Sequence, residues 1–408
     1  MNRGFLYGVA MNKLTVSSIN FKGKKTLVRV DFNVPLDNKQ NITDERRIVA
    51  SLPTIKKIMG DGGRLILCSH LGRPKGKAVP QMSLKPVAEK LSELLGKEVM
   101  LAPDCIGDMV ESMAESLSDG DIILLENLRF HPEETANERN FAKKLSVLAD
   151  IYVNDAFGSA HRAHASTEGV TRYFEQCAAG FLMEKELQYL GKALTDPERP
   201  FVAVFGGAKI SGKIDVIENL LEKVNGIIIG GGMVFTFLKA MGKEIGDSLL
   251  EEDKVALADL IIKKAEAIKL NLILPSDIAV ASEISEDAEV SYVPADKIPA
   301  GMKGLDIGPD SIKHFAHELG KAKTVVWNGP MGVFEIEKFA RGTYEMAKIL
   351  ADITAKGAVT IVGGGDSASA VSKCGLDDKL THISTGGGAS LEFLEGKTLP
   401  GVAALTDA

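Results

Sequence analysis

The chain has 408 residues, of which 45% are hydrophobic and 25% charged, and its formal net charge at pH 7 is −7. This length exceeds what one hydrophobic core usually serves and favours two domains, while the composition excludes extensive disorder. The acidic balance argues against a nucleic-acid or anionic-membrane binder, which would need a basic face. An anionic ligand would therefore have to be met by a local basic cluster.

The cysteines and the N-terminus point to a cytoplasmic protein. The four cysteines are scattered, without a C-x-x-C pair or a histidine at metal-ligand spacing, so we interpret them as buried thiols in a reducing compartment. The opening MNRGFLYGVA is too short and too weakly apolar for a signal peptide, and no run has membrane-spanning length. Met11 restarts an ordinary opening, so residues 1–10 are interpreted as an extension without a role in the fold.

In the first half of the chain, short β-branched runs alternate with helical patterns. Strands are predicted at 25–32, 63–69, 97–102, 121–126 and 150–154. Helices are predicted at 46–60, 84–95, 106–117 and 137–148. The alternation is typical of a mainly parallel sheet with helices on both faces.

A break between two halves follows. The stretch FLMEKELQYLGKAL has apolar residues at helical spacing, and TDPERP adds two prolines after it. Beyond it, strands are predicted at 201–205, 226–229, 271–274, 324–327 and 359–362. Helices are predicted at 213–223, 233–240, 252–269, 309–319, 338–355 and 367–374.

The sequence thus predicts an α/β protein with two doubly wound, Rossmann-like parallel-sheet domains joined by a long helix and a hinge. The predicted boundaries are an N-terminal domain at 1–180, the connecting helix at 181–195, a C-terminal domain at 196–390 and a final segment at 391–408.

Arginines follow the predicted strands of the first half, where ligands bind in open parallel sheets. Arg47 opens a helix, and Arg73, Arg129 and Arg162 each lie just beyond a strand. A single arginine at such a place is more often a surface ion pair or a helix cap, but four together predict a pocket for phosphate and carboxylate groups.

Further polar residues accompany these arginines. His70 and His164 lie near them in the sequence. For His161 and His164, a structural hydrogen bond and a contact with ligand are equally good explanations. Asp31 and Asn33, directly after the first strand, could form hydrogen bonds to a hydroxyl group of a ligand in the same pocket.

Glycine clusters follow the strands of the second half: FGGAK, IGGGM, VGGGDS and STGGGAS. Glycine is common in tight turns, but several clusters after apolar strands predict backbone close to a phosphate chain. Lys209 and Lys213 add charge at the first cluster. The segment resembles a P-loop, with Gly207, Gly212 and Lys213 in place but Ile214 where a magnesium-binding hydroxyl would stand.

Two other interpretations stay open. Gly363, Gly365 and Ala368 satisfy the dinucleotide pattern of an oxidoreductase, although the Asp366 carboxylate would repel a bare pyrophosphate and would hold one through Mg²⁺. A catalytically idle nucleotide-binding protein is the second alternative. The sequence has no G-x-S-x-G elbow and no HRD or DFG signature, so it favours an acceptor that is already ionised and needs no base.

From about Leu14 to the C-terminus, the motifs resemble those of the phosphoglycerate kinase family, in the family's order. They are RVDFNVPLD, SHLGRP, LLENLRFHPEE, YVNDAFGSAHRAHAS, FGGAKISGK, IIIGGGM, LDIGP, WNGPMGVFE, VGGGDS and STGGGAS. HPEETANERNFAKKLS is similar to the bacterial form of the family. The resemblance implies reversible phosphoryl transfer from 1,3-bisphosphoglycerate to ADP, giving 3-phosphoglycerate and ATP, with Mg²⁺ and after hinge closure.

The resemblance also implies roles for individual residues. The catalytic groups would be Arg47, Lys209 and Lys213. The phosphoglycerate would be bound by Asp31, Phe32, Asn33, Arg47, His70, Leu71, Gly72, Arg73, Arg129 and Arg162. The nucleotide would be bound by Lys213, Gly304, Asn328, Glu335, Gly364, Gly365, Asp366 and Ser367, with Asp366 on the metal. The segment EGKTLPGVAAL would fold back onto the first domain, no nucleic-acid or membrane partner is expected, and the mechanism requires only a monomer.

Overall fold

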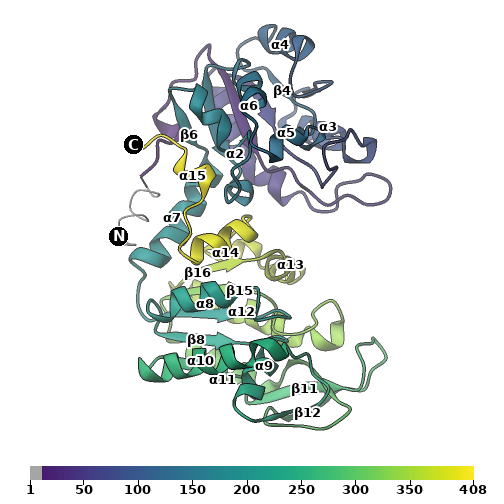
Figure 1. Ribbon diagram of the computed structural model, residues 1–408, viewed down its shortest axis with the longest axis vertical. Coiled ribbons are helices and arrows are strands. Elements are labelled where there is room, and N and C mark those ends of the chain that lie inside the picture. Colours follow the sequence, from purple (N-terminus) through teal and green to yellow (C-terminus); the bar gives the residue numbers. More distant parts are fainter. Residues whose placement is uncertain (1–11) are drawn as a thin grey trace. The chain divides into compact units, whose positions relative to one another are not determined.

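The computed structural model describes residues 12–408, so the extension at residues 1–10 lies outside the described residues. The chain forms two compact units: one runs up to Gln188 and includes Thr398–Ala408, and the other is Tyr189–Lys397 (Figure 1). The boundary falls inside helix α7 (Phe181–Thr195), where the sequence predicts a long helix. The final segment joins the first unit from Thr398, whereas the sequence-based boundary lies at residue 391.

The first unit is built on a six-stranded parallel sheet with strand order β3-β4-β2-β1-β5-β6. Its strands are β1 (Lys25–Val30), β2 (Arg64–Cys68), β3 (Met100–Leu101), β4 (Ile122–Leu124), β5 (Ile151–Asp155) and β6 (Cys177–Ala179). Its flanking helices are α2 (Arg46–Gly60), α3 (Lys85–Leu95), α4 (Asp108–Glu115), α5 (Pro132–Thr135) and α6 (Arg139–Ser146). Helices cover the sheet, so β5 is buried at every position and β1 at all but its first, as expected for parallel strands.

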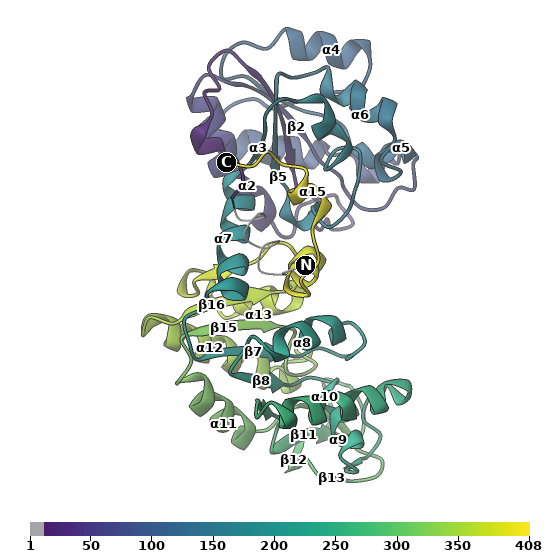
Figure 2. The same ribbon diagram turned by 60° about the vertical axis from the view of Figure 1, so that its left-hand side comes forward.

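The C-terminal segment packs against this first unit. Helix α15 (Pro400–Ala403) lies beside it in both views (Figure 1 and Figure 2). Thr406 N donates to Cys177 O of β6 at 2.9 Å, and Gly401 N donates to Ala160 O at 2.8 Å. The buried ammonium of Lys13 donates to Leu405 O at 2.9 Å and pairs with Asp407 at 2.6 Å. Main-chain and charged contacts thus tie the end of the chain to its beginning.

The second unit contains another six-stranded parallel sheet, with strand order β10-β8-β7-β15-β16-β17. Its strands are β7 (Phe201–Phe205), β8 (Gly226–Ile229), β10 (Asn271–Ile273), β15 (Thr324–Asn328), β16 (Val359–Gly363) and β17 (His382–Ile383). Its helices are α8 (Ile214–Leu221), α9 (Val234–Ala240), α10 (Val255–Ala267), α11 (Pro309–Leu319), α12 (Arg341–Ala355), α13 (Gly365–Lys373) and α14 (Gly388–Leu394). The two sheets confirm the predicted α/β class.

The second unit also has a small antiparallel sheet that the sequence analysis missed. Strand β11 (Asp277–Ala281) pairs with β12 (Ser291–Pro294) on one side and β14 (Lys303–Ile307) on the other. Strand β12 is mostly exposed, so its sequence carries almost no burial pattern, and β14 was noted only for Gly304 and the LDIGP motif. A further two-stranded pair, β9 (Glu244–Ile245) with β13 (Lys297–Ile298), and strand β6 were also missed.

Some predicted elements are shorter in the structure than in the sequence analysis. The strand predicted at 97–102 is confined to Met100–Leu101, and the helix predicted at 106–117 spans Asp108–Glu115. Met100 is exposed, because β3 lies at the edge of its sheet. Hydrophobic residues near an edge strand do not all join the hydrogen-bonded ladder, and this accounts for the difference.

Candidate active site

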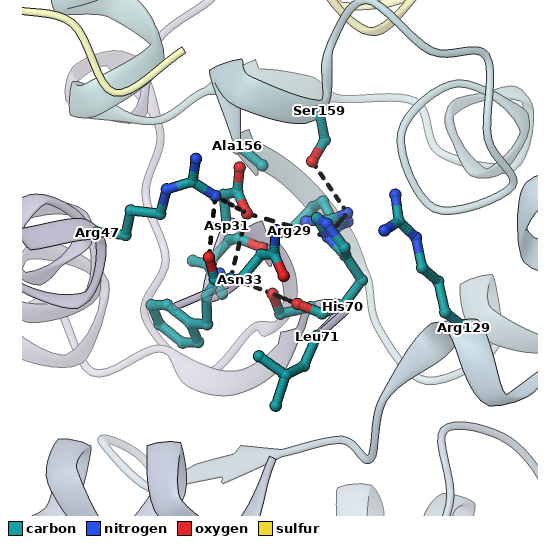
Figure 3. A network of polar contacts seen from close by, with 12 residues as sticks. Arg29, Asp31, Asn33, Arg47, His70, Leu71, Arg129, Ala156 and Ser159 are labelled. Carbon is teal, nitrogen blue, oxygen red and sulfur yellow. Dashed lines mark hydrogen bonds and ion pairs between the residues drawn. The ribbon is translucent and has the colours of Figure 1, made fainter. Parts of the chain in front are cut away.

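The carboxyl ends of four adjacent strands form the polar edge of the first unit. Strands β4, β2, β1 and β5 are neighbours and parallel, so the segments that follow them meet at one edge. Figure 3 shows that Asp31, Asn33, His70, Arg129 and Ser159 from these segments surround one space.

Arg47, in the first turn of α2, reaches back to the segment after β1. Its Nη1 lies 3.2 Å from Asp31 Oδ1 and donates to Asn33 O, also at 3.2 Å. The neighbouring Arg46 instead pairs with Asp44. The structure therefore directs Arg47, and not Arg46, into the candidate site (Figure 3).

Asn33 links the segment after β1 to the segment after β2. Its side-chain oxygen accepts a hydrogen bond from Gly72 N at 2.8 Å, and Gly72 O accepts one from Arg129 Nη1 at 2.8 Å. Phe32 and Leu71 belong to the hydrophobic core, so their side chains anchor these two segments to the core. Only their main chains are available to the candidate site.

His70 lies in the centre of the arginine cluster and is buried. Its Nδ1 is 3.1 Å from Arg29 Nη2. Burial holds the pKa of His70 well below its usual value, and neighbouring positive charges lower that pKa further. These charges belong to Arg29, Arg129, Arg47 and Arg162. His70 is therefore neutral, and the charges that act on it make this edge strongly attractive to anions.

Arg29 was missed by the sequence analysis. It lies within β1 and is 1% exposed, and its Nε donates to Ser166 Oγ at 2.9 Å. Ser166 Oγ in turn donates at 2.6 Å to Glu134, a fully buried carboxylate whose pKa is raised by burial. An arginine between two valines of a buried strand was the available signal, because a buried guanidinium needs such partners.

The other predicted arginines and histidines differ in their surroundings. Arg129 is buried, and burial together with the charges of Arg29 and Arg162 lowers its pKa to about 10. Arg162 is half-buried and its Nε donates to His161 Nε2 at 3.1 Å. Arg73 is exposed. Burial lowers the pKa of His164 to about 4, so this imidazole is neutral at physiological pH.

In the second unit, the loops after β7, β15 and β16 line a cavity of about 370 Å³. Its walls include Lys209, Lys213, Asn328, Gly364, Gly365, Asp366 and Ser367. Lys213 Nζ donates to Asn328 Oδ1, and Ser367 Oγ accepts from Gly329 N at 2.7 Å. The structure therefore brings together all these residues, which the sequence analysis assigned to catalysis, nucleotide binding and metal binding.

Burial affects the charge and the hydrogen bonding of two groups in this cavity. It lowers the pKa of Lys213 to about 8, an effect that the Asp366 carboxylate opposes. Asn328 is 2% exposed, and its Nδ2 has no hydrogen-bond partner among the described residues. A buried donor without a partner is uncommon, and it suits an oxygen atom of a bound ligand.

The glycines at this edge allow close packing of the main chain. A Cβ on Gly206 would lie 2.1 Å from Pro330 O, so no other residue fits there. Gly364 has a φ of 90°, a left-handed conformation that places α13's N-terminus at the cavity. Gly206 thus allows two loops to pack closely, whereas Gly364 allows the N-terminus of α13 to face the cavity.

A second cavity, of about 470 Å³, adjoins the first and shares Gly207, Ala208, Pro330 and Asp366 with it. Its lining is largely apolar and includes Phe235, Leu249, Ile278 and Val333. Gly304 and Glu335, both predicted, also line it. A Cβ on Gly304 would lie 2.1 Å from the Phe235 ring, so glycine keeps this wall open. An apolar cavity suits a nucleotide base, and the adjoining cavity, lined by lysines and glycine main chain, suits its phosphates.

The surroundings of Asp366 fit Mg²⁺. Its carboxylate is exposed at the first turn of α13 and forms no hydrogen bond or ion pair with a described residue. It lies beside glycine main chain and near the Lys213 charge. A free carboxylate next to a phosphate site is the ligand that Mg²⁺ uses when it also binds phosphate oxygens.

Fold and site together define a two-unit α/β protein of the phosphotransferase class. One unit presents an anion-binding edge rich in arginine, and the other presents two adjoining cavities that are lined by Lys209, Lys213 and Lys303. Within residues 12–408, none of the helices combines the length and apolar character needed to cross a membrane.

Comparisons with known proteins agree with this class. A sequence profile described as phosphoglycerate kinase matches residues 16–397. A phosphoglycerate kinase of Chlorobaculum tepidum is 62% identical over 397 residues, which are 97% of this chain and 100% of that protein. One of Chlorobium limicola is also 62% identical with the same coverage.

Solved structures give the same result. The phosphoglycerate kinase of Coxiella burnetii has a TM-score of 0.87 and 43% identity, covering 96% of this chain and 98% of that one. The enzyme of Pyrococcus horikoshii has a TM-score of 0.83 and 33% identity, again covering 96% and 98%. The chain belongs to the phosphoglycerate kinase family, and it is a glycolytic kinase.

Proposed function

We propose that the protein transfers a phosphoryl group reversibly between 1,3-bisphosphoglycerate and ADP, giving 3-phosphoglycerate and ATP. The observation that carries this proposal is the convergence of four guanidinium groups on the neutral His70. Such a cluster on a chain of net charge −7 is suited to a small, highly anionic substrate.

In the first unit, the arginines bind the phosphate of the phosphoglycerate and its carboxylate side. Arg129 and Arg162 supply bidentate contacts, and the exposed Arg73 is free to reach a ligand. Asp31 and Asn33, held by Arg47 and Gly72, bind the hydroxyl group. The neutral imidazole of His70 offers a hydrogen bond without adding a further charge.

In the second unit, the adenine and ribose lie in the apolar cavity, against Gly304 and Glu335. The phosphates lie in the adjoining cavity, against Gly364, Gly365 and Ser367. Asn328 Nδ2 donates to a phosphate oxygen, which gives this buried donor a partner. Asp366 holds Mg²⁺, which neutralises part of the phosphate charge when it is bound.

The chemistry needs no general base, because the acceptor is a carboxylate. In the ATP-consuming direction, an oxygen of the 3-phosphoglycerate carboxylate forms a bond to the γ-phosphorus. The bond from that phosphorus to the β,γ-bridging oxygen breaks, and ADP leaves with the electron pair. Arg47, Lys209 and Lys213 neutralise charge on the transferring group, a stabilisation that is greatest in the transition state.

We further propose that hinge closure brings the two ligands into line and excludes water, and that the protein acts as a cytoplasmic monomer. Small-angle scattering tests the closure: the radius of gyration should decrease only when both ligands are bound. An unchanged radius with both ligands would contradict closure while leaving the reaction itself intact.

The reaction is tested by ADP release from Mg-ATP with and without 3-phosphoglycerate, in a coupled assay that removes the acyl phosphate. Release that depends on 3-phosphoglycerate is the expected result. Release without it indicates an ATPase, and no release indicates an idle relative of the family. Binding of a nicotinamide cofactor would instead favour the oxidoreductase interpretation.

A further inference from the structure

Three potential metal ligands meet in the first unit, outside the candidate active site. Asp104 and Cys105 lie in the loop between β3 and α4, and His131 lies between the 3-10 helix η3 (Leu128–Phe130) and α5. The sequence analysis treated Cys105 as an isolated thiol, because no histidine stands near it in the chain. Strands β3 and β4 are paired, and the segments that follow them therefore lie at the same edge of the sheet.

The geometry of this triad suits a small four-coordinate cation. One oxygen, one sulfur and one nitrogen of Asp104, Cys105 and His131 all lie within 4.8 Å of one another, and His131 Nε2 is 2.7 Å from Asp104 Oδ1. Zinc bonds of about 2.0–2.3 Å place two ligand atoms at most about 4.6 Å apart. Small side-chain adjustments therefore bring all three atoms within bonding distance of one ion. Among residues 12–408, no other group of three such ligands is found.

The surroundings hold the ligands in place and leave a path to solvent. The His131 ring packs on Phe141, with a centroid separation of 5.2 Å, and Cys105 is fully buried. The Asp104 side chain is 48% exposed, so an ion and a water molecule can reach the triad from that side. Fixed ligand orientation is the usual condition for tight metal binding.

A simpler explanation is a hydrogen-bonded group in which Asp104 pairs with His131 and with the Cys105 thiol. These contacts hold one oxygen, one sulfur and one nitrogen within 4.8 Å of one another, which is also the arrangement that a bound metal ion requires. A cation of suitable softness is the partner that uses all three groups.

We propose that Asp104, Cys105 and His131 form a binding site for a thiophilic divalent cation of the Zn²⁺ class. On binding, the cation forms a bond to the Cys105 sulfur, and the thiol proton is released to solvent. His131 Nε2 and an Asp104 oxygen supply two further bonds, and water completes the coordination. The site is separate from the Mg²⁺ proposed at Asp366, which belongs to the second unit.

The site also adjoins the anion-binding edge, because Arg129 precedes His131 by two residues in the same short segment. An ion that fixes His131 therefore restrains the main chain that presents Arg129. This connection is a consequence of the site and is not needed for its test.

Co²⁺ titration of the full-length, fully reduced chain tests the proposal, because Co²⁺ takes zinc sites and reports its ligands by absorption. We expect one equivalent to bind with a sulfur-to-cobalt charge-transfer band, displaced by Zn²⁺ but not by excess Mg²⁺. The variants Cys105→Ser and His131→Phe should each weaken binding by at least about tenfold, and Cys105→Ser should abolish the band. The control Cys374→Ser, at a half-buried thiol of the second unit, should bind as the parent chain does.

Thermal unfolding in the absence of metal shows whether each variant is folded. His131→Phe keeps a ring against Phe141, so it is the variant to use if Cys105→Ser does not fold. The absence of a charge-transfer band in the parent chain would overturn the proposal. A band that survives Cys105→Ser, or one that is lost in Cys374→Ser, would also overturn it.

Discussion

Arg47 Nη1 and Asp31 Oδ1 lie 3.2 Å apart and join the first turn of α2 to the segment after β1. The Asp31 side chain is 8% exposed and that of Arg47 is 32% exposed, so Asp31 is buried beneath a partly exposed Arg47 at the anion-binding edge. Arg47 also donates to Asn33 O, and its guanidinium is thus oriented without a ligand. Such preorganisation lowers the cost of meeting charge that develops during phosphoryl transfer.

Arg47→Ala should lower turnover by about 100-fold or more, as is usual when a preorganised transition-state donor is removed. Arg46→Ala is the matched control, because Arg46 is adjacent, carries the same charge and pairs with Asp44. Its turnover should stay within about twofold of the parent enzyme. Steady-state kinetics in both directions measures the effect, and an equal loss in both variants would remove Arg47 from its assigned role.

Arg162→Ala should weaken 3-phosphoglycerate binding by about 10- to 100-fold, the usual cost of losing a hydrogen bond between charged groups. Nucleotide binding should be unchanged, because the nucleotide cavities lie in the other unit. Arg172→Ala is a suitable control, since Arg172 is exposed and pairs with Glu168. Calorimetry with each ligand separately gives the comparison, and similar losses for both ligands would contradict the assignment of one ligand to each unit.

Much of this architecture could be predicted because the parallel strands are buried. Apolar runs such as Phe201–Phe205 predict buried parallel strands, and the topology of such a sheet places the residues after each strand at one edge. The sequence therefore located Asp31, His70 and Asp366 at strand ends. It could not locate Arg29 as a site residue, because strand periodicity does not show which buried charge has partners from distant segments.

Contacts between distant segments account for the other omissions. The fully buried Glu134 accepts a hydrogen bond from Ser166 of a different loop, and Asp104 meets His131 because the paired strands β3 and β4 place the segments that follow them at one edge. Asp306 is similar: it lines the apolar cavity and accepts from Gly342 N at 2.7 Å, and burial raises its pKa to about 7. None of these relationships leaves a pattern in the local sequence.

Glu251→Ala should loosen the loop that carries Lys209 and Lys213. Glu251 Oε2 accepts from Ile210 N at 2.6 Å and from Ser211 N at 3.2 Å, so its removal leaves these two donors without their partner. We expect a loss of about 1–3 kcal/mol in the free energy of unfolding, together with lower turnover. The control Glu252→Ala removes an exposed neighbouring carboxylate. Unchanged stability and turnover for Glu251→Ala would show that the loop needs no such support.

Asp366→Asn should weaken the binding of Mg-ATP. The binding of metal-free ATP should weaken much less or should become slightly tighter. The carboxylate repels bare phosphate and attracts it through the cation, so its neutralisation acts with opposite sign in the two cases. Calorimetry with excess Mg²⁺ and with EDTA makes the comparison. Asp378→Asn, at an exposed residue of the same unit, serves as the control. An equal change with and without Mg²⁺ would exclude Asp366 as the metal ligand.

Lys213 should give the enzyme an alkaline limit. Its pKa is lowered to about 8, so the ammonium is charged below that pH and neutral above it. Because the charge is needed as the phosphoryl group leaves, kcat/KM for the nucleotide should decline as pH rises through about 8. Lys213→Arg keeps its charge in this range and should remove the decline, although the shape of its side chain lowers the maximum rate. Lys213→Ala should reduce turnover more than nucleotide affinity at pH values below about 8, where the parent side chain is charged. A parent profile that stays flat well above pH 8, or a decline that persists in Lys213→Arg, would assign the alkaline limit to another group.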